Sequence, residues 1–357
     1  MATQNVTLVE KLTLLPHVAV GLSLGFLRLA TRPLTSDVKP PTAFQDFAYA
    51  VARYVLSNVT IPHEKWLAPP TETNYLDFAR AKNFQPDTAV LPSGVKVHWI
   101  GNKSAEKVFL YFHGGGYVNS ISPAHLAWLF DLEAELSKTK KIAVAVLGYT
   151  CAPEGQYPLQ LKQAAESLVW MLQTEGKKPE DIFIGGDSAG GNLALALFSH
   201  ILHPHPSLGE DLRIKLPGPL AGAVITSPWV KFATDDDSVK RNEGSDFVCE
   251  TAANRWSSAF MGSAPDDNYN QPILAPADWF SGLDKVIKGM FVWGGESEVL
   301  IDSIDAIVKK LKASYPQTEY VKTKGGAHVG WLAHKMFGYK GKEESTEAIE
   351  SWMTARL

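Results

Sequence analysis

The alternation of apolar and polar stretches along this chain predicts a regular succession of strands and helices between residues 107 and 323. Short apolar runs indicate buried strands, and apolar residues at every third or fourth position indicate helices. The expected strands are 107–112, 142–147, 181–185, 221–227, 289–293 and 320–323. The expected helices are 123–136, 159–173, 190–203 and 299–311, with a last helix at the end of the chain. Strands that alternate with helices predict an α/β fold with a mainly parallel, doubly wound sheet.

Two regions lie outside this alternation. Residues 36–85 carry mostly helical spacing, and residues 231–285 form a long insertion between two expected core strands. An insertion of that length is more often a packed cap than a structureless loop. We therefore expect an N-terminal helical segment that belongs partly to the cap (1–87), a first core part (88–230), a cap insertion (231–285) and a second core part (286–357).

The N-terminal region contains an apolar segment, residues 12–29. A proline and two glycines interrupt it, which argues against a membrane span, and Glu10 and Lys11 do not make a signal-peptide leader. Helical spacing of apolar residues predicts an amphipathic helix here, with a face formed by Val18, Leu22, Phe26 and Ala30. Packing on the protein itself and contact with a membrane or partner both stay open. We expect a cytoplasmic protein, with membrane association through this helix as the alternative.

Composition excludes several classes of protein. The chain has 357 residues, of which 45% are hydrophobic and 20% charged, values typical of a soluble enzyme. A formal net charge of −4 without a basic stripe argues against nucleic-acid binding. The two cysteines, Cys151 and Cys249, form neither a disulfide framework nor a zinc motif, so we expect no metal site.

The candidate chemistry centres on residues 186–190, Gly-Asp-Ser-Ala-Gly, between an expected strand and an expected helix. This is the context of a nucleophile elbow, in which a strained turn exposes Ser188 above the sheet edge. Gly186 and Gly190 remove the β-carbons that would clash there. The N–H of Ala189, at the start of a helix, suits a developing oxyanion.

A second glycine-rich stretch, residues 113–117, directly follows the first buried strand and reads His-Gly-Gly-Gly-Tyr. Consecutive glycines bring main-chain N–H groups close to a ligand, so Gly114, Gly115 and Gly116 are the expected further oxyanion donors. We expect His113 to brace this loop.

The expected base is His328, in a loop after the last strand, where the order Ser, acid, His places it. We expect His125, His203, His205 and His334 to be structural. Three carboxylates are candidates for the acid, Glu296, Glu298 and Asp302. Glu298 is preferred because it stands at the expected strand-to-helix bend, whereas Asp302 lies within the helix. Four aromatic residues are candidates for the lining of the substrate pocket or for a small core of the cap: Tyr117, Trp256, Phe260 and Trp279.

From residue 88 onward the chain resembles the hormone-sensitive-lipase branch of the α/β-hydrolase esterases, especially the steryl acetyl hydrolase and arylacetamide deacetylase group. The resemblance rests on four stretches, residues 113–117, 186–192, Ala152-Pro153-Glu154 with Tyr157-Pro158, and Ser227-Pro228-Trp229. It implies an α/β-hydrolase fold with a two-part helical cap, and ester hydrolysis without metal or cofactor. The family's usual acid motif, Asp-Pro-Leu-x-Asp-Glu, aligns its first Asp with Glu298. A second departure is Gly148-Tyr149-Thr150-Cys151, where the family commonly has Asp-Tyr-Arg-Leu.

The function expected from these features is hydrolysis of a short acyl group from a small hydrophobic ester, through an acyl-enzyme on Ser188. An acyltransferase, a lactonase or an amidase would use the same three residues. A non-catalytic receptor on the same fold would keep the pocket but need no base, and a cyclase would leave Ser188 idle.

Overall fold

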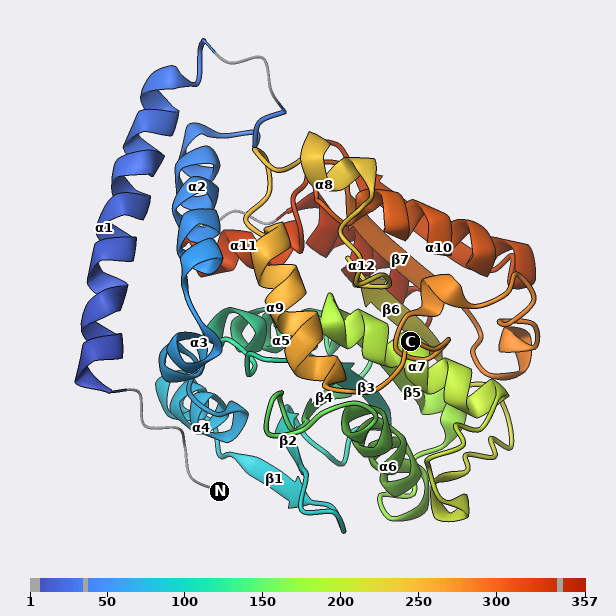
Figure 1. The fold of residues 1–357 in the computed structure, drawn as a ribbon. Coiled ribbons are helices and arrows are strands. Elements are labelled where there is room, and N and C mark those ends of the chain that lie inside the picture. The colour runs from blue at the N-terminus through green and yellow to red at the C-terminus, as the bar shows by residue number, and fades with distance from the viewer. Residues whose placement is uncertain (1–6, 35–37, 339–342) are drawn as a thin grey trace.

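The computed structural model describes residues 7–34, 38–338 and 343–357. Its centre is an eight-stranded sheet with the order β1-β2-β4-β3-β5-β6-β7-β8 (Figure 1). The strands are β1 (Asp87–Val90), β2 (Lys96–Ile100), β3 (Lys107–Phe112), β4 (Ile142–Gly148), β5 (Ile182–Asp187), β6 (Gly222–Thr226), β7 (Met290–Gly295) and β8 (Thr318–Thr323). The pairs β1–β2 and β2–β4 are antiparallel, and all the others are parallel. The predicted α/β fold with a mainly parallel sheet is confirmed.

The helices that accompany these strands follow the predicted periodicity. They are α5 (Pro123–Leu136), α6 (Leu159–Gln173), α7 (Ala189–Leu202), α10 (Ile301–Ser314), α11 (Gly330–Met336) and α12 (Glu344–Thr354). α5 contacts α11 and α12, and α6 contacts α7. Figure 1 shows α6 and α7 on the viewer's side of the sheet and α12 behind it.

The register of the central strands brings the motif loops together. Every residue of β3 and β5 is buried, which explains their continuous apolar sequences. β3 and β5 are parallel neighbours, with Phe112 opposite Gly186. The loop that begins at His113 and the turn at Ser188 therefore leave the same edge of the sheet side by side. The carboxyl ends of β6 and β7 meet at this edge as well, where Asp187 lies opposite Thr226.

Four helices precede the sheet: α1 (Leu8–Thr31), α2 (Ala43–Asn58), α3 (Ile61–Leu67) and α4 (Thr71–Lys82). α1 lies along α2 at one side of the molecule (Figure 1). The predicted N-terminal helix is thus confirmed, and α1 is long and apolar enough to cross a membrane.

The apolar face predicted for α1 is present, and it does not pack on the protein. Val18, Leu22 and Phe26 are exposed, Phe26 by 63%, and Ala30 is exposed too. Among the residues of α1 whose burial is described, the buried ones are Leu14, Gly21 and Gly25. A Cβ on Gly25 would lie 2.8 Å from atoms of Phe47 and Val51 in α2. Two small residues thus bring the helices into close contact and leave the larger apolar side chains facing outward.

The insertion between β6 and β7 contains two α-helices, α8 (Asp237–Arg241) and α9 (Glu250–Met261), and two short 3₁₀ helices, η3 (Pro272–Leu274) and η4 (Leu283–Lys285). α9 contacts α2, and α8 contacts α10. The insertion therefore touches both the N-terminal helices and the core. The division of the chain into cap and core at 87, 230 and 285 stays a prediction.

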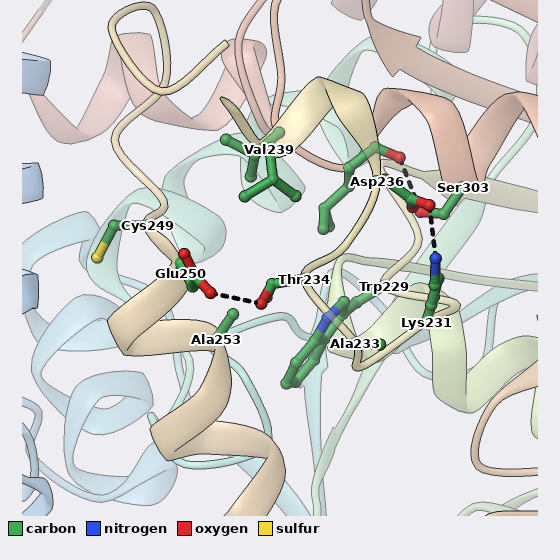
Figure 2. A pocket seen from close by; sticks show the side chains of 12 residues that line it. Trp229, Lys231, Ala233, Thr234, Asp236, Val239, Cys249, Glu250, Ala253 and Ser303 are labelled. Atoms are coloured by element: carbon green, nitrogen blue, oxygen red, sulfur yellow. Dashed lines mark hydrogen bonds and ion pairs between the residues drawn. The ribbon is translucent and has the colours of Figure 1, made fainter. Parts of the chain in front are cut away.

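A narrow pocket remains between this insertion and the core (Figure 2). Trp229, Cys249 and Ala253 line one part of it, and Val299 and Ser303 line another. Its volume of about 10 Å³ is room for a single water molecule. Figure 2 shows Lys231 paired with Asp236, and Thr234 bonded to Glu250, at its walls.

Candidate active site

Ser188 occupies the turn between β5 and α7 in a strained conformation, with φ 53° and ψ −117°. Left-handed φ values are uncommon for residues with a side chain, and they persist where the surrounding structure enforces them. A Cβ on Gly190 would lie 1.9 Å from the Phe112 carbonyl oxygen, and one on Gly186 would lie 2.5 Å from Gly190 atoms. Both glycines are therefore required by close backbone contacts, as the elbow pattern predicts.

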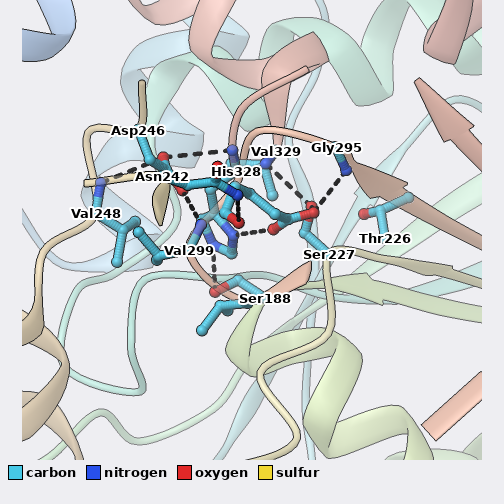
Figure 3. A network of polar contacts seen from close by, with 12 residues as sticks. Ser188, Thr226, Ser227, Asn242, Asp246, Val248, Gly295, Val299, His328 and Val329 are labelled. Carbon is cyan, nitrogen blue, oxygen red and sulfur yellow. Dashed lines mark hydrogen bonds and ion pairs between the residues drawn. The ribbon is translucent and has the colours of Figure 1, made fainter. Parts of the chain in front are cut away.

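Three side chains from distant parts of the chain form a hydrogen-bonded series at this turn (Figure 3). The Ser188 Oγ lies 2.9 Å from His328 Nε2. The His328 Nδ1 lies 2.7 Å from Glu298 Oε2. An ionised carboxylate only accepts hydrogen bonds, so Nδ1 carries the proton and Nε2 accepts the proton of the Ser188 hydroxyl.

Of the three candidate acids, the structure brings Glu298 to His328. Its other oxygen, Oε1, accepts hydrogen bonds from the Gly295 N–H at 2.6 Å and the Ser227 hydroxyl at 3.0 Å. Glu296 is exposed to solvent. Asp302 bonds Arg241 and the Ser238 N–H in the insertion.

The electrostatic surroundings of His328 favour its protonated form. Burial would lower the pKa of His328, but the hydrogen bond and charge of Glu298, and the charges of Asp246 and Asp187, raise it above its ordinary value. The nearby carboxylates therefore stabilise the imidazolium that forms when His328 takes the proton of Ser188.

The glycine loop, residues 113–119, leaves the sheet beside the elbow. Among the described residues, the N–H groups of Gly115, Gly116 and Ala189 have no hydrogen-bond acceptor. Gly115 and Gly116 have φ values of 112° and 60°, which explains the need for glycine at both positions.

The prediction for Gly114 is wrong. Its N–H donates to Asp187 Oδ1 at 2.8 Å and is not available to a substrate. A Cβ on Gly114 would lie 2.3 Å from Asp187 Oδ2, so Gly114 is needed for the approach of this carboxylate. The remaining candidate donors are Gly115, Gly116 and Ala189.

Asp187, next to the serine, braces the glycine loop, a role that the motif alone did not reveal. It accepts hydrogen bonds from the Tyr111 hydroxyl at 2.6 Å and from His125 Nε2 at 3.1 Å, besides that of Gly114. Burial alone would raise the pKa of Asp187, but His125 and the hydrogen bonds from Tyr111 and Gly114 hold it below its ordinary value.

His113, at the start of the glycine loop, is buried as well. Its ring stacks on Tyr149, whose hydroxyl donates to the His113 carbonyl.

The four predicted pocket residues take three different places. Tyr117 and Phe260 are buried and stack on each other with ring centroids 3.8 Å apart. Trp256 lies against the glycine loop: a Cβ on Gly116 would fall 2.5 Å from the Trp256 ring. Trp279 donates to the Ser199 hydroxyl and lies against the tilted His203 ring, at the opposite end of α7 from Ser188. The pocket assignment of Trp279 is therefore wrong, and that of Trp256 stays a prediction.

Glu64, in α3, joins the N-terminal helices to α9 and to the glycine loop. Its Oε1 accepts two hydrogen bonds from the Arg255 guanidinium, at 2.9 Å and 2.6 Å. Its Oε2 accepts from Trp256 Nε1 and from Asn119 Nδ2, each at 2.7 Å. The Asn119 N–H donates in turn to the Gly115 carbonyl. One buried carboxylate thus holds both the Trp256 ring and the loop that presents the free N–H groups.

The remaining histidines have structural partners, as predicted. His125 sits on α5 against Asp187, and His203 bonds the Trp279 carbonyl. His205 bonds the Tyr157 hydroxyl, and His334, on α11, pairs with Glu343. No group of three or more His, Cys, Asp or Glu in the described ranges is arranged to hold a metal ion.

Comparison with known proteins places this site in a family. The family described as having the alpha/beta hydrolase fold matches residues 109–332. An esterase of Acinetobacter venetianus is 29% identical over 262 residues, which are 71% of this chain and 79% of that protein. An acetyl-hydrolase of Streptomyces hygroscopicus is 28% identical over 214 residues, 59% of this chain and 64% of its own length, so the match spans less than two thirds of that relative.

A solved structure shows the same fold over nearly the whole chain. The crystal structure of an esterase from the bacterial hormone-sensitive lipase family has 22% identity and a TM-score of 0.64, and it covers 96% of this chain and 98% of its own. The resemblance predicted from the motifs is confirmed at the level of family and fold.

Proposed function

The chain belongs to the alpha/beta hydrolase family, and on that premise we propose that it is a serine carboxylic-ester hydrolase with Ser188 as nucleophile, His328 as base and Glu298 as acid. The observation that carries the proposal is the series Ser188 Oγ–His328 Nε2 at 2.9 Å and His328 Nδ1–Glu298 Oε2 at 2.7 Å, set beside free main-chain N–H groups. Relatives named esterase and acetyl-hydrolase support the same activity.

The first half of the reaction acylates the serine. His328 Nε2 takes the Ser188 proton as Oγ attacks the ester carbonyl. The carbonyl oxygen becomes an oxyanion, which accepts hydrogen bonds from the N–H groups of Gly115, Gly116 and Ala189. Glu298 fixes the tautomer of His328 and stabilises the imidazolium. The tetrahedral intermediate then expels the alcohol, whose oxygen takes the proton from Nε2, and the acyl group stays on Ser188.

The second half releases the acid. A water molecule gives one proton to His328 Nε2 and attacks the acyl carbon. The oxyanion that forms again accepts hydrogen bonds from the same N–H groups. Collapse of this intermediate returns the proton to Ser188 Oγ and frees the carboxylic acid. The sum is one ester and one water converted to one acid and one alcohol, with no added cofactor.

A hydrophobic ester with a short acyl group is the substrate class that the surroundings of Ser188 favour. The Trp256 ring against Gly116 and the buried pair Tyr117 and Phe260 make an apolar environment beside the free N–H groups. The similarity to an acetyl-hydrolase agrees with a short acyl group.

The experiment that tests this proposal is labelling with a fluorophosphonate followed by peptide mass analysis, together with hydrolysis of nitrophenyl esters of increasing chain length. We expect one phosphonylated residue, Ser188, and a turnover that falls as the acyl chain lengthens. An unlabelled Ser188 would favour a receptor on this fold. Acyl esters or amides formed with an added alcohol or amine would favour an acyltransferase, and preferred opening of lactones or cleavage of amides would favour those activities.

We further propose that the outer face of α1 rests on a lipid surface. Leu15 and Phe26 are exposed by 64% and 63%, and most of the other large apolar residues of the helix are also exposed. Arg28 and Arg32 turn inward to Asp46, which leaves this face apolar. Burial of such a face in the boundary of a bilayer stabilises peripheral proteins by the hydrophobic effect.

A further inference from the structure

A short segment of the insertion, residues 238–246, fastens the loop that carries Glu298. The Ser238 hydroxyl donates to the Val299 carbonyl at 2.7 Å, and Asn242 Nδ2 donates to the Glu298 carbonyl at 2.8 Å. The Ser245 hydroxyl donates to the Ser297 carbonyl at 2.9 Å. Side chains of the insertion therefore donate to three successive carbonyls of the acid loop, residues 296–300.

Asp246, the last residue of this segment, contacts both the acid loop and the base loop, residues 324–329, which carries His328 (Figure 3). Its Oδ2 accepts the Val299 N–H, adjacent to Glu298, at 2.8 Å. Its Oδ1 accepts the Phe247 N–H at 2.7 Å and faces the His328 N–H at 3.4 Å. The Asp246 carboxylate therefore links the backbone of Val299, next to Glu298, to the backbone of His328.

The charge environment of Asp246 couples it to His328. The side chain is completely buried, and the groups that face it are His328 and Glu298 from the core loops and Arg53 and Tyr49 from α2. Arg53 donates to the Asp246 carbonyl oxygen at 2.5 Å. Burial raises the pKa of Asp246 to about 6, and Glu298 adds to the rise while His328 opposes it. The charge of Asp246 also helps to raise the pKa of His328.

We propose that Asp246 is a positioning residue for the reaction: it holds the acid loop and the base loop at their working separation and adds a second negative charge beside His328. The proposal rests on the function proposed above for Ser188, His328 and Glu298. The insertion then takes part in proton transfer, because Asp246, one of its side chains, holds Glu298 and His328 at a fixed separation.

An asparagine at position 246 has the same shape but does not replace the carboxylate. Both oxygens of Asp246 accept main-chain N–H groups, from Val299 on one side and Phe247 on the other. The amide NH₂ of asparagine would face one of these donors and repel it. The variant also removes a negative charge, so the pKa of His328 falls and the acid limb of kcat/KM moves to lower pH.

The test is the pH profile of ester hydrolysis by Asp246→Asn and Asp246→Glu beside the wild-type enzyme. For Asp246→Asn we expect an acid limb shifted down by on the order of half a pH unit or more and a kcat about ten- to a hundredfold lower. For Asp246→Glu, which keeps the charge but displaces it, we expect a similar loss of kcat with the acid limb near its wild-type position. The second variant keeps the test decisive if the first does not fold.

Asp46→Asn is the matched control, because Asp46 is also a buried carboxylate but pairs with Arg28 and Arg32, and neither the acid loop nor His328 is among its hydrogen-bond or ion-pair partners in the described ranges. It should lower Tm and leave the acid limb in place. An unmoved acid limb in Asp246→Asn, or wild-type kcat in Asp246→Glu, overturns the positioning role. Undiminished turnover in Ser188→Ala would instead overturn the proposed function, so the two failures are distinct.

Discussion

The N–H of Gly114 donates to Asp187 Oδ1 at 2.8 Å, and this contact ties the glycine loop to the residue that precedes the nucleophile. The same carboxylate accepts from Tyr111 and His125, so Asp187 serves three donors in a buried setting. The loop that offers the N–H groups of Gly115 and Gly116 is thus positioned by the elbow itself.

Asp187→Asn should weaken both folding and turnover. The asparagine NH₂ would face the His125 N–H, and a buried donor left without an acceptor costs about 1–3 kcal/mol. We expect a free energy of unfolding lower by that amount in urea titration, and a kcat reduced by more than tenfold with KM little changed. The depressed pKa of Asp187 also predicts that its contribution to wild-type stability is present above the carboxyl's unfolded pKa and is lost as the pH falls through the lower folded pKa. A variant with wild-type stability and kcat would contradict the bracing role.

Gly116→Ala should reduce turnover sharply. Its φ of 60° disfavours a side chain, and the new Cβ would lie 2.5 Å from the Trp256 ring, so the loop or the ring must move. Loss of one oxyanion donor costs about 100- to 1000-fold in kcat, and we expect an effect within or just below that range. Gly94→Ala is the control, since Gly94 has φ 86° but no atom within 4 Å of the added Cβ. Similar kcat losses in both variants would show that the effect is not local to the site.

The rate of ester hydrolysis should fall as the pH is lowered, and the midpoint of this fall should lie above the ordinary pKa of a histidine. His328 must be neutral to accept the Ser188 proton, and its pKa is raised by Glu298, Asp246 and Asp187 despite burial. Turnover should therefore rise as the pH increases through this raised pKa and fall as the pH drops below it. The measurement is kcat/KM against pH for a nitrophenyl acetate. An acid limb well below the ordinary histidine pKa of about 6.5 would contradict the assignment.

Glu64→Gln should weaken the attachment of α3 to α9 and to the glycine loop. The substitution leaves the Arg255 guanidinium without its carboxylate and turns an NH₂ toward Trp256 or Asn119, and loss of one partner of a buried ion pair costs about 3–5 kcal/mol. We expect a lower Tm and a higher KM. Glu154→Gln is the control, because its pair with Lys65 on the same helix α3 is partly exposed and should matter by no more than about 1 kcal/mol. Equal Tm changes in the two variants would contradict the role of Glu64.

Membrane contact through α1 is tested by flotation with phosphatidylcholine vesicles. The wild-type chain should float with the vesicles, and the double variant Leu15→Glu with Phe26→Glu should remain in the soluble fraction, since charges at the boundary oppose insertion. Val90→Glu, at a residue of β1 that is also 63% exposed, should float as the wild type does. Unchanged flotation of the double variant would contradict the proposal.

Much of the core was predictable because its signals are local. The strands β3 and β5 are buried at every position, so their sequences are apolar throughout, and the helix over Pro123–Leu136 has its predicted bounds. Ser188 is indicated by the motif that follows the buried strand β5, and His328 by its place in the loop after the last strand, β8, which is only partly buried. Glu298 was preferred from the start of the next helix, and the structure brings it to His328.

The features that the sequence did not reveal depend on distant partners. The N–H of Gly114 is engaged by a carboxylate 73 positions away, so a run of three glycines does not indicate which of them are free. The contact face of α1 follows from close approach at Gly21 and Gly25 and not from apolar spacing. Asp246 stands in no recognisable motif, and its contacts with Val299 and His328 arise only when the insertion folds onto the core.

Replacement of Ser188 by alanine is the most direct test of the central claim, that this hydroxyl attacks the ester. The measurement is steady-state hydrolysis of a nitrophenyl acetate by the purified variant, with circular dichroism to show that the fold is kept. We expect turnover to fall by roughly a millionfold, because loss of the nucleophile disables the whole series of groups. Turnover within about tenfold of the wild-type value would contradict the account.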